Sequence, residues 1–148
     1  MITILQRVSE AKVVVEGQIV GQIGLGLAAL VAVQRDDTAE DIAWTVGKLA
    51  SLRIFRSGDK HFEIDVRQAG GSILLISNFT VAGATRKGRR PSFDAAAPPD
   101  VGRKLFDDLV IAMRSTGIPV ATGIFGADMQ VSLVNDGPVT FVVESRQS

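Results

Sequence analysis

The run Ser77-Asn78-Phe79-Thr80 carries the side chains of this sequence that are best suited to chemistry. Two hydroxyls and an amide stand at the end of an apolar run that begins at Ile73. Buried polar groups in folded proteins have hydrogen-bond partners. The cluster is therefore either bonded to the backbone or available to a ligand, and the sequence leaves both interpretations open.

Side chains that could activate these hydroxyls are scarce. The chain has no Cys and a single His, His61, which lies in a polar stretch without metal-ligand spacing. A Ser-His-Asp triad would have to use His61, and nothing in the sequence brings it near Ser77. A Ser or Thr hydroxyl without a base is a poor nucleophile. Dinucleotide and Walker motifs are also absent, so we expect no metal and no cofactor.

A dense basic run comprises Arg86, Lys87, Arg89 and Arg90 around Gly88. The sixteen Lys and Arg residues of the chain are balanced by sixteen Asp and Glu residues. Any contact with nucleic acid must therefore come from a local patch and not from net charge. A solvated loop is the simplest interpretation of this run, and contact with phosphates is the alternative.

An aromatic and a thioether side chain, Phe125 and Met129, lie among the glycines Gly123 and Gly126. Packing at the start of a strand would explain both residues. A flat slot that stacks a nucleic-acid base on them is the functional alternative.

The pair Gly137-Pro138 interrupts two alternating apolar runs, at residues 131–134 and 139–143. The preceding Asn135 and Asp136, with Gly137, are typical of a hairpin turn. Proline donates no hydrogen bond to a strand ladder, so Pro138 is expected at a strand start or an edge. The pair is either a plain turn or a small, stiff projection with bare carbonyls that could reject a ligand by its shape.

Hydrophobic patterns predict an α/β fold in a single domain that spans residues 1–148. We expect a mixed sheet in layers, with two helices packed on one side. Helices are expected after residues 36–38 and after Pro98 and Pro99. Strands are expected at residues 2–8, 12–15, 18–23, 27–33, 52–55, 73–81, near 120, and at 129–134 and 139–144. Residues 56–62 are expected to form a polar excursion.

Targeting signals are not evident in the sequence. The segment Met1 to Val8 lacks the apolar core of a signal peptide. No run of 18 apolar residues occurs, which predicts that no segment spans a membrane. Together with the absence of Cys, these features predict a cytoplasmic protein without a membrane partner.

Taken in order, several segments resemble the D-aminoacyl-tRNA deacylase family over nearly the whole chain. Each motif is weak alone, but the ordered set is specific. The matching segments are Gln6-Arg7-Val8-Ser9, Leu52-Arg53-Ile54-Phe55, Ser77-Asn78-Phe79-Thr80-Val81, Thr85-Arg86-Lys87-Gly88-Arg89-Arg90-Pro91-Ser92-Phe93, Gly126-Ala127-Asp128-Met129-Gln130-Val131 and Asn135-Asp136-Gly137-Pro138-Val139-Thr140.

The resemblance implies the family's fold and a homodimer that acts on tRNA and not on DNA. It implies hydrolysis of the ester between a D-amino acid and the terminal adenosine, and removal of glycine mischarged on alanine tRNA. The family's Gly-Pro pair, here Gly137-Pro138, is cis and enters the active site of the opposite subunit to exclude L-amino acids.

The resemblance also assigns the remaining site residues. Ser77, Asn78, Phe79 and Thr80 would line the pocket, with the backbone of Phe79 holding the ester. Two residues, Phe125 and Met129, match positions around the adenine. Arg7 matches a residue that helps to hold the Gly-Pro loop. The chemistry would use the terminal 2′-hydroxyl of the tRNA in place of a protein base.

This sequence departs from the family pattern at Asn78, where the family has Gln, and at Val81, where it has Leu. Asn is one methylene shorter than Gln, so the departure bears on rate and substrate range. One alternative is therefore a catalytically weak RNA-binding homodimer of the same fold. A second alternative is a sheet-based interaction module without an RNA role.

Overall fold

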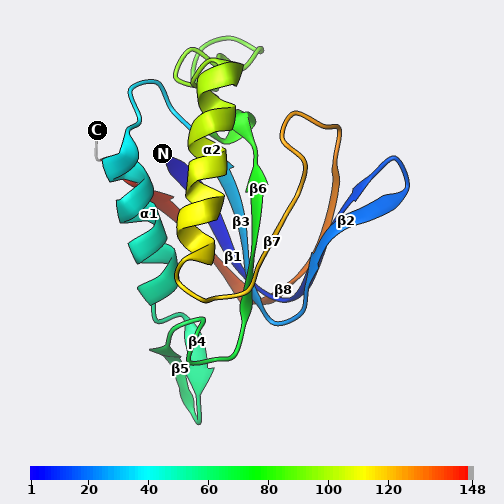
Figure 1. Ribbon diagram of the computed structural model, residues 1–148, viewed down its shortest axis with the longest axis vertical. Coiled ribbons are helices and arrows are strands. Elements are labelled where there is room, and N and C mark those ends of the chain that lie inside the picture. The colour runs from blue at the N-terminus through cyan, green and yellow to red at the C-terminus, as the bar shows by residue number, and fades with distance from the viewer. Residues whose placement is uncertain (147–148) are drawn as a thin grey trace.

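The body of the chain is a mixed sheet that carries both long helices on one face (Figure 1). The computed structural model describes residues 1–146. Within them the helices are α1 (Ala39–Ser51) and α2 (Pro99–Arg114), with a short 3-10 helix, η1 (Phe79–Ala82). The strands are β1 (Ile2–Val15), β2 (Gln18–Ile23), β3 (Gly26–Ala32), β4 (Phe55–Ser57), β5 (Lys60–Ile64), β6 (Ser72–Ser77), β7 (Val120–Thr122) and β8 (Gln130–Glu144). The predicted α/β class, with helices on one side of a mixed sheet, is confirmed. None of the helices in residues 1–146 is long and apolar enough to cross a membrane.

Strand order in the main sheet is β2-β1-β3-β6-β7, and β8 runs along the other side of β1. The strands β3, β6 and β7 are parallel, whereas β1 pairs antiparallel with β2, β3 and β8. The carboxyl ends of β3, β6 and β7 therefore meet at one edge of the sheet. Such an edge is where open α/β sheets place their ligands.

The central strands β3 and β6 are buried on both faces, which explains their continuous apolar sequences. On the helix side, Leu27 and Leu75 pack with Leu49 of α1 and Leu109 of α2, all fully buried. A second cluster on the opposite face contains Val8, Val13, Ala28, Leu74 and Ile76.

The second cluster exists because the sheet coils until β2 approaches β7. A Cβ atom added to Gly21 of β2 would lie only 2.2 Å from the carbonyl oxygen of Thr122 in β7. Only glycine permits this approach of the two backbones. The sheet is consequently barrel-like at this end.

Local signals set the start of each helix. The N-cap of α1 is Thr38, whose side chain accepts from the backbone N–H of Glu40, while Asp41 accepts from the backbone N–H of Thr38. This reciprocal pair is a capping box. Pro98 and Pro99 begin α2, where a missing N–H costs nothing. Both predicted starts are confirmed.

The predicted strand boundaries are wrong in four places. The strand predicted at 52–55 overlaps β4 only at Phe55. The predicted pairs of strands at 2–8 with 12–15, and at 129–134 with 139–144, are the single strands β1 and β8. The strand predicted at 73–81 ends at Ser77, where the chain turns into η1. The excursion at 56–62 lies mostly within the β4–β5 hairpin, whose exposed side chains gave no apolar pattern.

A buried charge cluster joins both ends of the described chain. The amino group of Met1 donates to Asp37 at 2.8 Å and to Ser145 at 2.9 Å, and the Asp37 side chain is fully buried. Arg146 also contacts Asp37, at 2.7 Å. Two cations therefore converge on one carboxylate, beside the start of α1.

The neighbouring carboxyl of Asp41 has a pKa below its ordinary value of 3.8. Burial raises this pKa. Hydrogen bonds from Ser145 and Thr38, together with the charges of the Met1 amino group and Arg146, lower it by more than burial raises it. A lowered folded-state pKa contributes stability above the unfolded pKa, and this contribution is lost as the pH falls through the folded value.

We expect Asp37→Asn to lower the free energy of unfolding by about 3 kcal/mol, because it leaves a buried ammonium group without its counter-charge. Denaturant unfolding at pH 7 measures the loss. Asp36→Asn, one residue away and exposed, is the matched control and should change stability by no more than about 0.5 kcal/mol. Equal stability of the two variants at pH 7 would contradict the assigned role of the cluster.

Candidate active site

A cavity of about 740 Å³ opens at the carboxyl ends of β3, β6 and β7. Each of these strands contributes the residues that follow it to the wall. Leu30 and Ile76 form part of its apolar lining, and the first turn of α2 closes one side. Cavities that bind small ligands typically measure about 300–1,000 Å³, so this one can hold the end of a substrate.

Of the predicted cluster Ser77-Asn78-Phe79-Thr80, the first three residues line this cavity and Thr80 is not part of its lining. The backbone N–H of Asn78 donates to the carbonyl of Val31 at 2.8 Å, which ties the end of β6 to the end of β3. Beyond this bond the chain turns into η1, and Phe79 emerges 56% exposed with its ring edge-on to Phe93. The strand end therefore presents backbone and aromatic surface to the cavity.

The hydroxyl of Thr80 is exposed and donates to the side-chain carbonyl oxygen of Asn78. An amide oxygen does not accept a proton near neutral pH, so this bond cannot activate the hydroxyl. His61 lies in the β4–β5 hairpin, at the opposite end of the molecule from the carboxyl end of β6 (Figure 1). In residues 1–146 no three His, Cys, Asp or Glu side chains are grouped as a metal site.

Phe125 and Met129 line the same cavity. The ring of Phe125 packs near Phe106 of α2, and the guanidinium carbon of Arg103 lies 4.7 Å from its centroid. The cavity wall thus includes a half-buried aromatic ring and a half-buried thioether. This arrangement is able to stack a nucleic-acid base.

The Gly137-Pro138 pair lies outside this cavity. Its peptide bond is cis, and both residues are exposed. Strands β3 and β1 lie between β6 and β8. Thr3 of β1 is level with Ser77 through Val31 of β3, and Arg7 lies four residues further along β1. The pair is therefore displaced from Ser77 both across the sheet and along the strands.

Arg7 lies beneath the Gly137-Pro138 pair. Its side chain is almost fully buried; Nε donates to the carbonyl of Asp136 at 2.9 Å and Nη1 donates to the carbonyl of Ile54 at 2.8 Å. The carboxylate of Asp136 lies 3.6 Å from Arg7 and 3.6 Å from Arg56. Arg7 therefore links the residue before Gly137 to the segment after α1.

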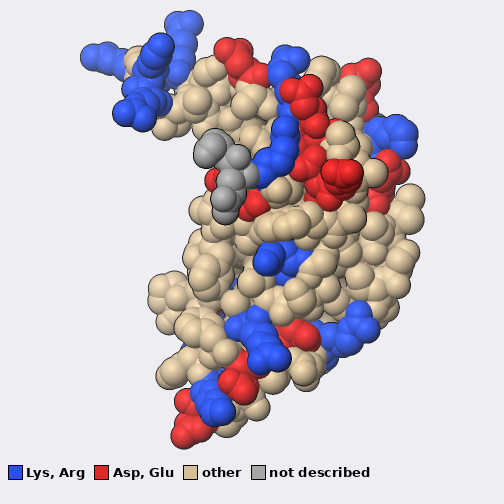
Figure 2. Space-filling view, turned by 90° about the vertical axis from the view of Figure 1, so that its left-hand side faces the viewer, with Lys and Arg blue, Asp and Glu red and all other residues tan. Residues whose placement is uncertain are grey.

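The basic residues Arg86, Lys87, Arg89 and Arg90 project from the loop between η1 and α2, and all four are exposed. Paired backbone hydrogen bonds between Ala84 and Ser92, at 2.7 and 2.8 Å, close this loop at its base. Figure 2 shows a group of Lys and Arg side chains, in blue, that project from the upper end of the molecule. The loop follows η1 directly, so its charge lies beside the cavity.

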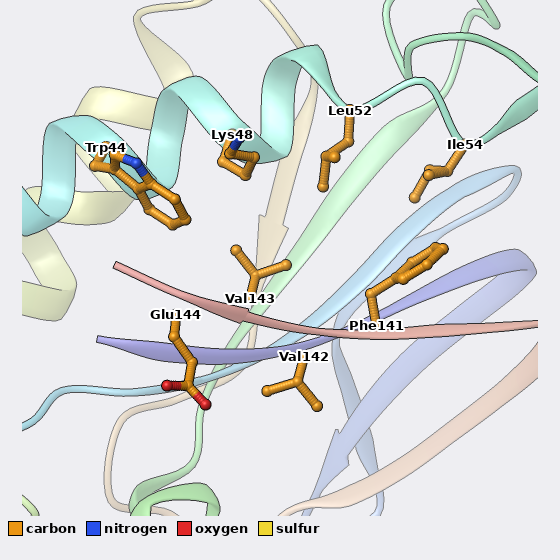
Figure 3. A pocket seen from close by; sticks show the side chains of 8 residues that line it. All are labelled: Trp44, Lys48, Leu52, Ile54, Phe141, Val142, Val143 and Glu144. Atoms are coloured by element: carbon orange, nitrogen blue, oxygen red, sulfur yellow. The ribbon is translucent and has the colours of Figure 1, made fainter. Parts of the chain in front are cut away.

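A second pocket, of about 460 Å³, lies between α1 and the end of β8 (Figure 3). Trp44, Phe141 and Val143 point into the space between the helix and the strand, whereas Glu144 points away from it. Its interior thus offers few polar groups, and no predicted site residue lines it.

Sequence reasoning missed part of the cavity wall. Leu30, Arg35, Phe93 and the first turn of α2 line it without having been singled out for this role. Leu30 and Arg35 could be placed only by knowing that β3 is parallel to β6. The strand order across the sheet, which decides this, leaves no local signal in the sequence.

Comparison with known proteins bears directly on this arrangement. A family model described as D-Tyr-tRNA(Tyr) deacylase matches residues 4–144. The chain belongs to this family. Similar relatives are the D-aminoacyl-tRNA deacylases of Geobacter sulfurreducens, 54% identical over 99% of this chain and 96% of that one, and of Desulfitobacterium hafniense, 49% identical over 100% and 99%.

Two solved structures share the fold of this chain. The chain matches a c-Myc DNA unwinding element binding protein with a TM-score of 0.94 and 32% identity, covering 99% and 100% of the two chains. It also matches a probable eukaryotic D-amino acid tRNA deacylase with a TM-score of 0.81, over 97% and 98% of the chains. At 20% identity the latter shows a shared fold.

For this deacylase-family chain, we expect Arg86→Gln with Arg89→Gln to weaken tRNA binding and to flatten its salt dependence. Each lost phosphate contact should reduce the slope of log affinity against log salt by roughly 0.7–0.9. The control is Arg53→Gln with Arg114→Gln, which removes the same net charge from exposed positions at the ends of α1 and α2 far from the loop. Equal salt slopes for the two double variants would show that the loop has no special role.

Proposed function

We propose that the chain is a homodimeric editing hydrolase in which Gly137-Pro138 of each subunit enters the cavity of the other. It cleaves the ester of D-aminoacyl-tRNA, and of glycyl-tRNA mischarged on alanine tRNA, in the cytoplasm. L-aminoacyl esters are rejected by this pair. The observation that carries the proposal is that a rigidly held, exposed Gly137-Pro138 pair lies outside the cavity of its own chain.

The open face of the sheet supports the homodimer. Both helices cover one face (Figure 1), and on the other face Ile2, Ile4 and Leu30 are only partly buried. Val142 on the same face is 62% exposed. Contiguous exposed apolar surface of this kind marks interaction sites. A second copy of the chain would cover this face and bring a Gly137-Pro138 pair to it.

The cavity suits the acceptor end of a charged tRNA. The terminal adenine would lie between Phe125 and Met129, with the ester held by the backbone at Phe79. The side chain of Asn78 forms no cap on the first N–H groups of η1, which are therefore available to the ester carbonyl. The exposed residues Arg86 to Arg90 next to the cavity would contact phosphates of the same strand.

The proposed reaction draws its activating group from the substrate. Water adds to the ester carbonyl, the bond to the 3′ oxygen of the adenosine breaks, and that oxygen leaves as a hydroxyl. The neighbouring 2′-hydroxyl of the ribose orients the water and relays the proton. The pairing of Thr80 with Asn78, and the distance of His61 from η1, support this assignment. DNA lacks the 2′-hydroxyl, so it is not a substrate.

Chirality is set by exclusion in this proposal. A pocket that penalises an L side chain does not also need to bind the D side chain. Its selectivity then comes from rejecting the L isomer. Glycine, without a side chain, should pass for the same reason. A D side chain points away from the inserted pair, whereas an L side chain points into its carbonyls.

The direct test compares deacylation of D-alanyl-, L-alanyl- and glycyl-tRNA on one tRNA. We expect hydrolysis of the D-alanyl and glycyl esters and none of the L-alanyl ester above the uncatalysed rate. Binding of tRNA without turnover would favour the weak RNA-binding homodimer that Asn78 suggests. A lack of both binding and turnover would leave only the interaction module.

Insertion from the opposite subunit is tested by mixing two variants that each lack selective D-activity. Gly137→Ala damages the pair, because its Cβ would lie 2.6 Å from the backbone nitrogen of Val139. Phe79→Ala damages the cavity. After subunit exchange, each mixed dimer contains one site with an intact cavity and an intact pair from the other subunit. Selective D-activity should return in the mixture, and its failure to return between folded, exchanging subunits would overturn insertion in trans.

We expect Thr80→Ala and Ser77→Ala to keep substantial activity, since neither hydroxyl has a base. A tRNA that ends in 2′-deoxyadenosine should react far more slowly with every variant. Single-turnover hydrolysis of D-aminoacyl esters of the two tRNAs measures both effects. Loss of turnover in Thr80→Ala, with the deoxy substrate cleaved normally by wild type, would assign the chemistry to the protein.

A further inference from the structure

The side chain of Asn135 bonds to Val139 across the interruption within β8. Its Oδ1 accepts from the backbone N–H of Val139 at 2.7 Å, and its Nδ2 donates to the carbonyl of Val139 at 3.1 Å. Two opposed hydrogen bonds of this kind join a residue pair in an antiparallel ladder. The amide of Asn135 thereby closes residues 136–138 into a three-residue loop at its base.

The same amide is fixed on its other side. Nδ2 also lies 3.2 Å from Oε1 of Gln6 and 3.0 Å from Oγ1 of Thr140. Gln6 and Thr140 are paired residues of β1 and β8, immediately beyond the interruption of the ladder. Asn135 is thus held by the regular part of the sheet while it holds the loop.

Strand register shows why this contact is needed. Gln6 pairs with Thr140 and Val8 pairs with Asn135, so that Arg7 alone faces the four residues from 136 to 139. An interruption of this size removes the ladder bonds that would otherwise fix the backbone. Arg7 restores a contact at Asp136, before Gly137. After Pro138, the bonds from Asn135 to Val139 supply the second contact.

We propose that Asn135 is a positioning residue that sets the D/L selectivity of the opposite site by fixing the exit of the Gly137-Pro138 loop. This inference rests on the proposed function. A loop held at Asp136 alone could pivot about that end, and its carbonyls would no longer meet an L side chain. Selectivity then depends on an amide that never touches the substrate.

Asn135→Asp is the sharpest variant, because it keeps the shape of the side chain. One carboxylate oxygen still accepts from the N–H of Val139, but the other now faces carbonyl oxygens of Val139 and Gln6 and donates to neither. Asn135→Ala removes both contacts without adding charge. Thr140→Val removes only one of the acceptors, and Ser132→Ala is an exposed control on the same strand, outside the loop.

The D/L ratio of single-turnover deacylation is expected to fall by about tenfold or more in Asn135→Asp and Asn135→Ala, as for the loss of two partly buried hydrogen bonds. Thr140→Val should lower it by no more than about threefold, and Ser132→Ala should leave it unchanged. Amide exchange at Val139 should accelerate in both Asn135 variants. The salt slope of tRNA binding should stay as in wild type.

The outcomes separate the two proposals. If wild type fails to hydrolyse D-aminoacyl-tRNA, the proposed function is wrong and the ratio has no meaning. If wild type is selective and both folded Asn135 variants retain its ratio, the positioning role is overturned. A lowered melting temperature with an unchanged ratio, or unchanged exchange at Val139, would likewise reduce Asn135 to a structural residue.

Discussion

The long antiparallel pairing of β1 with β8 is the constraint on which the rest of this structure depends. It runs from Ile2 with Glu144 to Val14 with Gln130, and its register shifts at two places: where Arg7 faces residues 136–139, and between Val8 and Glu10. Pairing on both sides of Arg7 leaves the surplus residues of β8 no room in the plane of the sheet. They are therefore extruded as an exposed loop, at a place determined by the register and not by the loop's own sequence.

The same sheet separates the two halves of the proposed site. Parallel strands bring their carboxyl ends together, so the cavity lies beyond Ser77 at one edge. The extruded loop lies on β8, with β1 and β3 between them. No side-chain movement crosses this distance within a chain. A protein that needs both parts at one substrate must join two copies, and the open sheet face with Ile4 and Leu30 offers the surface for it.

Local chemistry could be predicted from the sequence, whereas long-range geometry could not. The capping pattern at Thr38 and the prolines before α2 act within one helical turn, and both were found. Ser77, Asn78, Phe79, Phe125 and Met129 were expected in one pocket through the family resemblance, and they line one cavity. The strand ends, the β4–β5 hairpin and the role of Leu30 depend on partners far along the chain. Asn135 was interpreted as a turn residue because it precedes Asp136 and Gly137. Its pairing with Val139 depends on the register of β8 against β1, which the local sequence does not show.

Polar groups at both parts of the site are paired in ways that favour rigidity over reactivity. The Thr80 hydroxyl is bonded to an amide, and Arg7 is bonded to two backbone carbonyls. Neither arrangement creates a nucleophile or a base, but each fixes the surface that a substrate would meet. Fixed dipoles are effective when the reacting group is supplied by the substrate, because the protein need then only hold the ester and exclude the wrong isomer. In the proposed mechanism, the shorter side chain of Asn78 would alter the fit of the pocket, while the chemistry would still come from the tRNA.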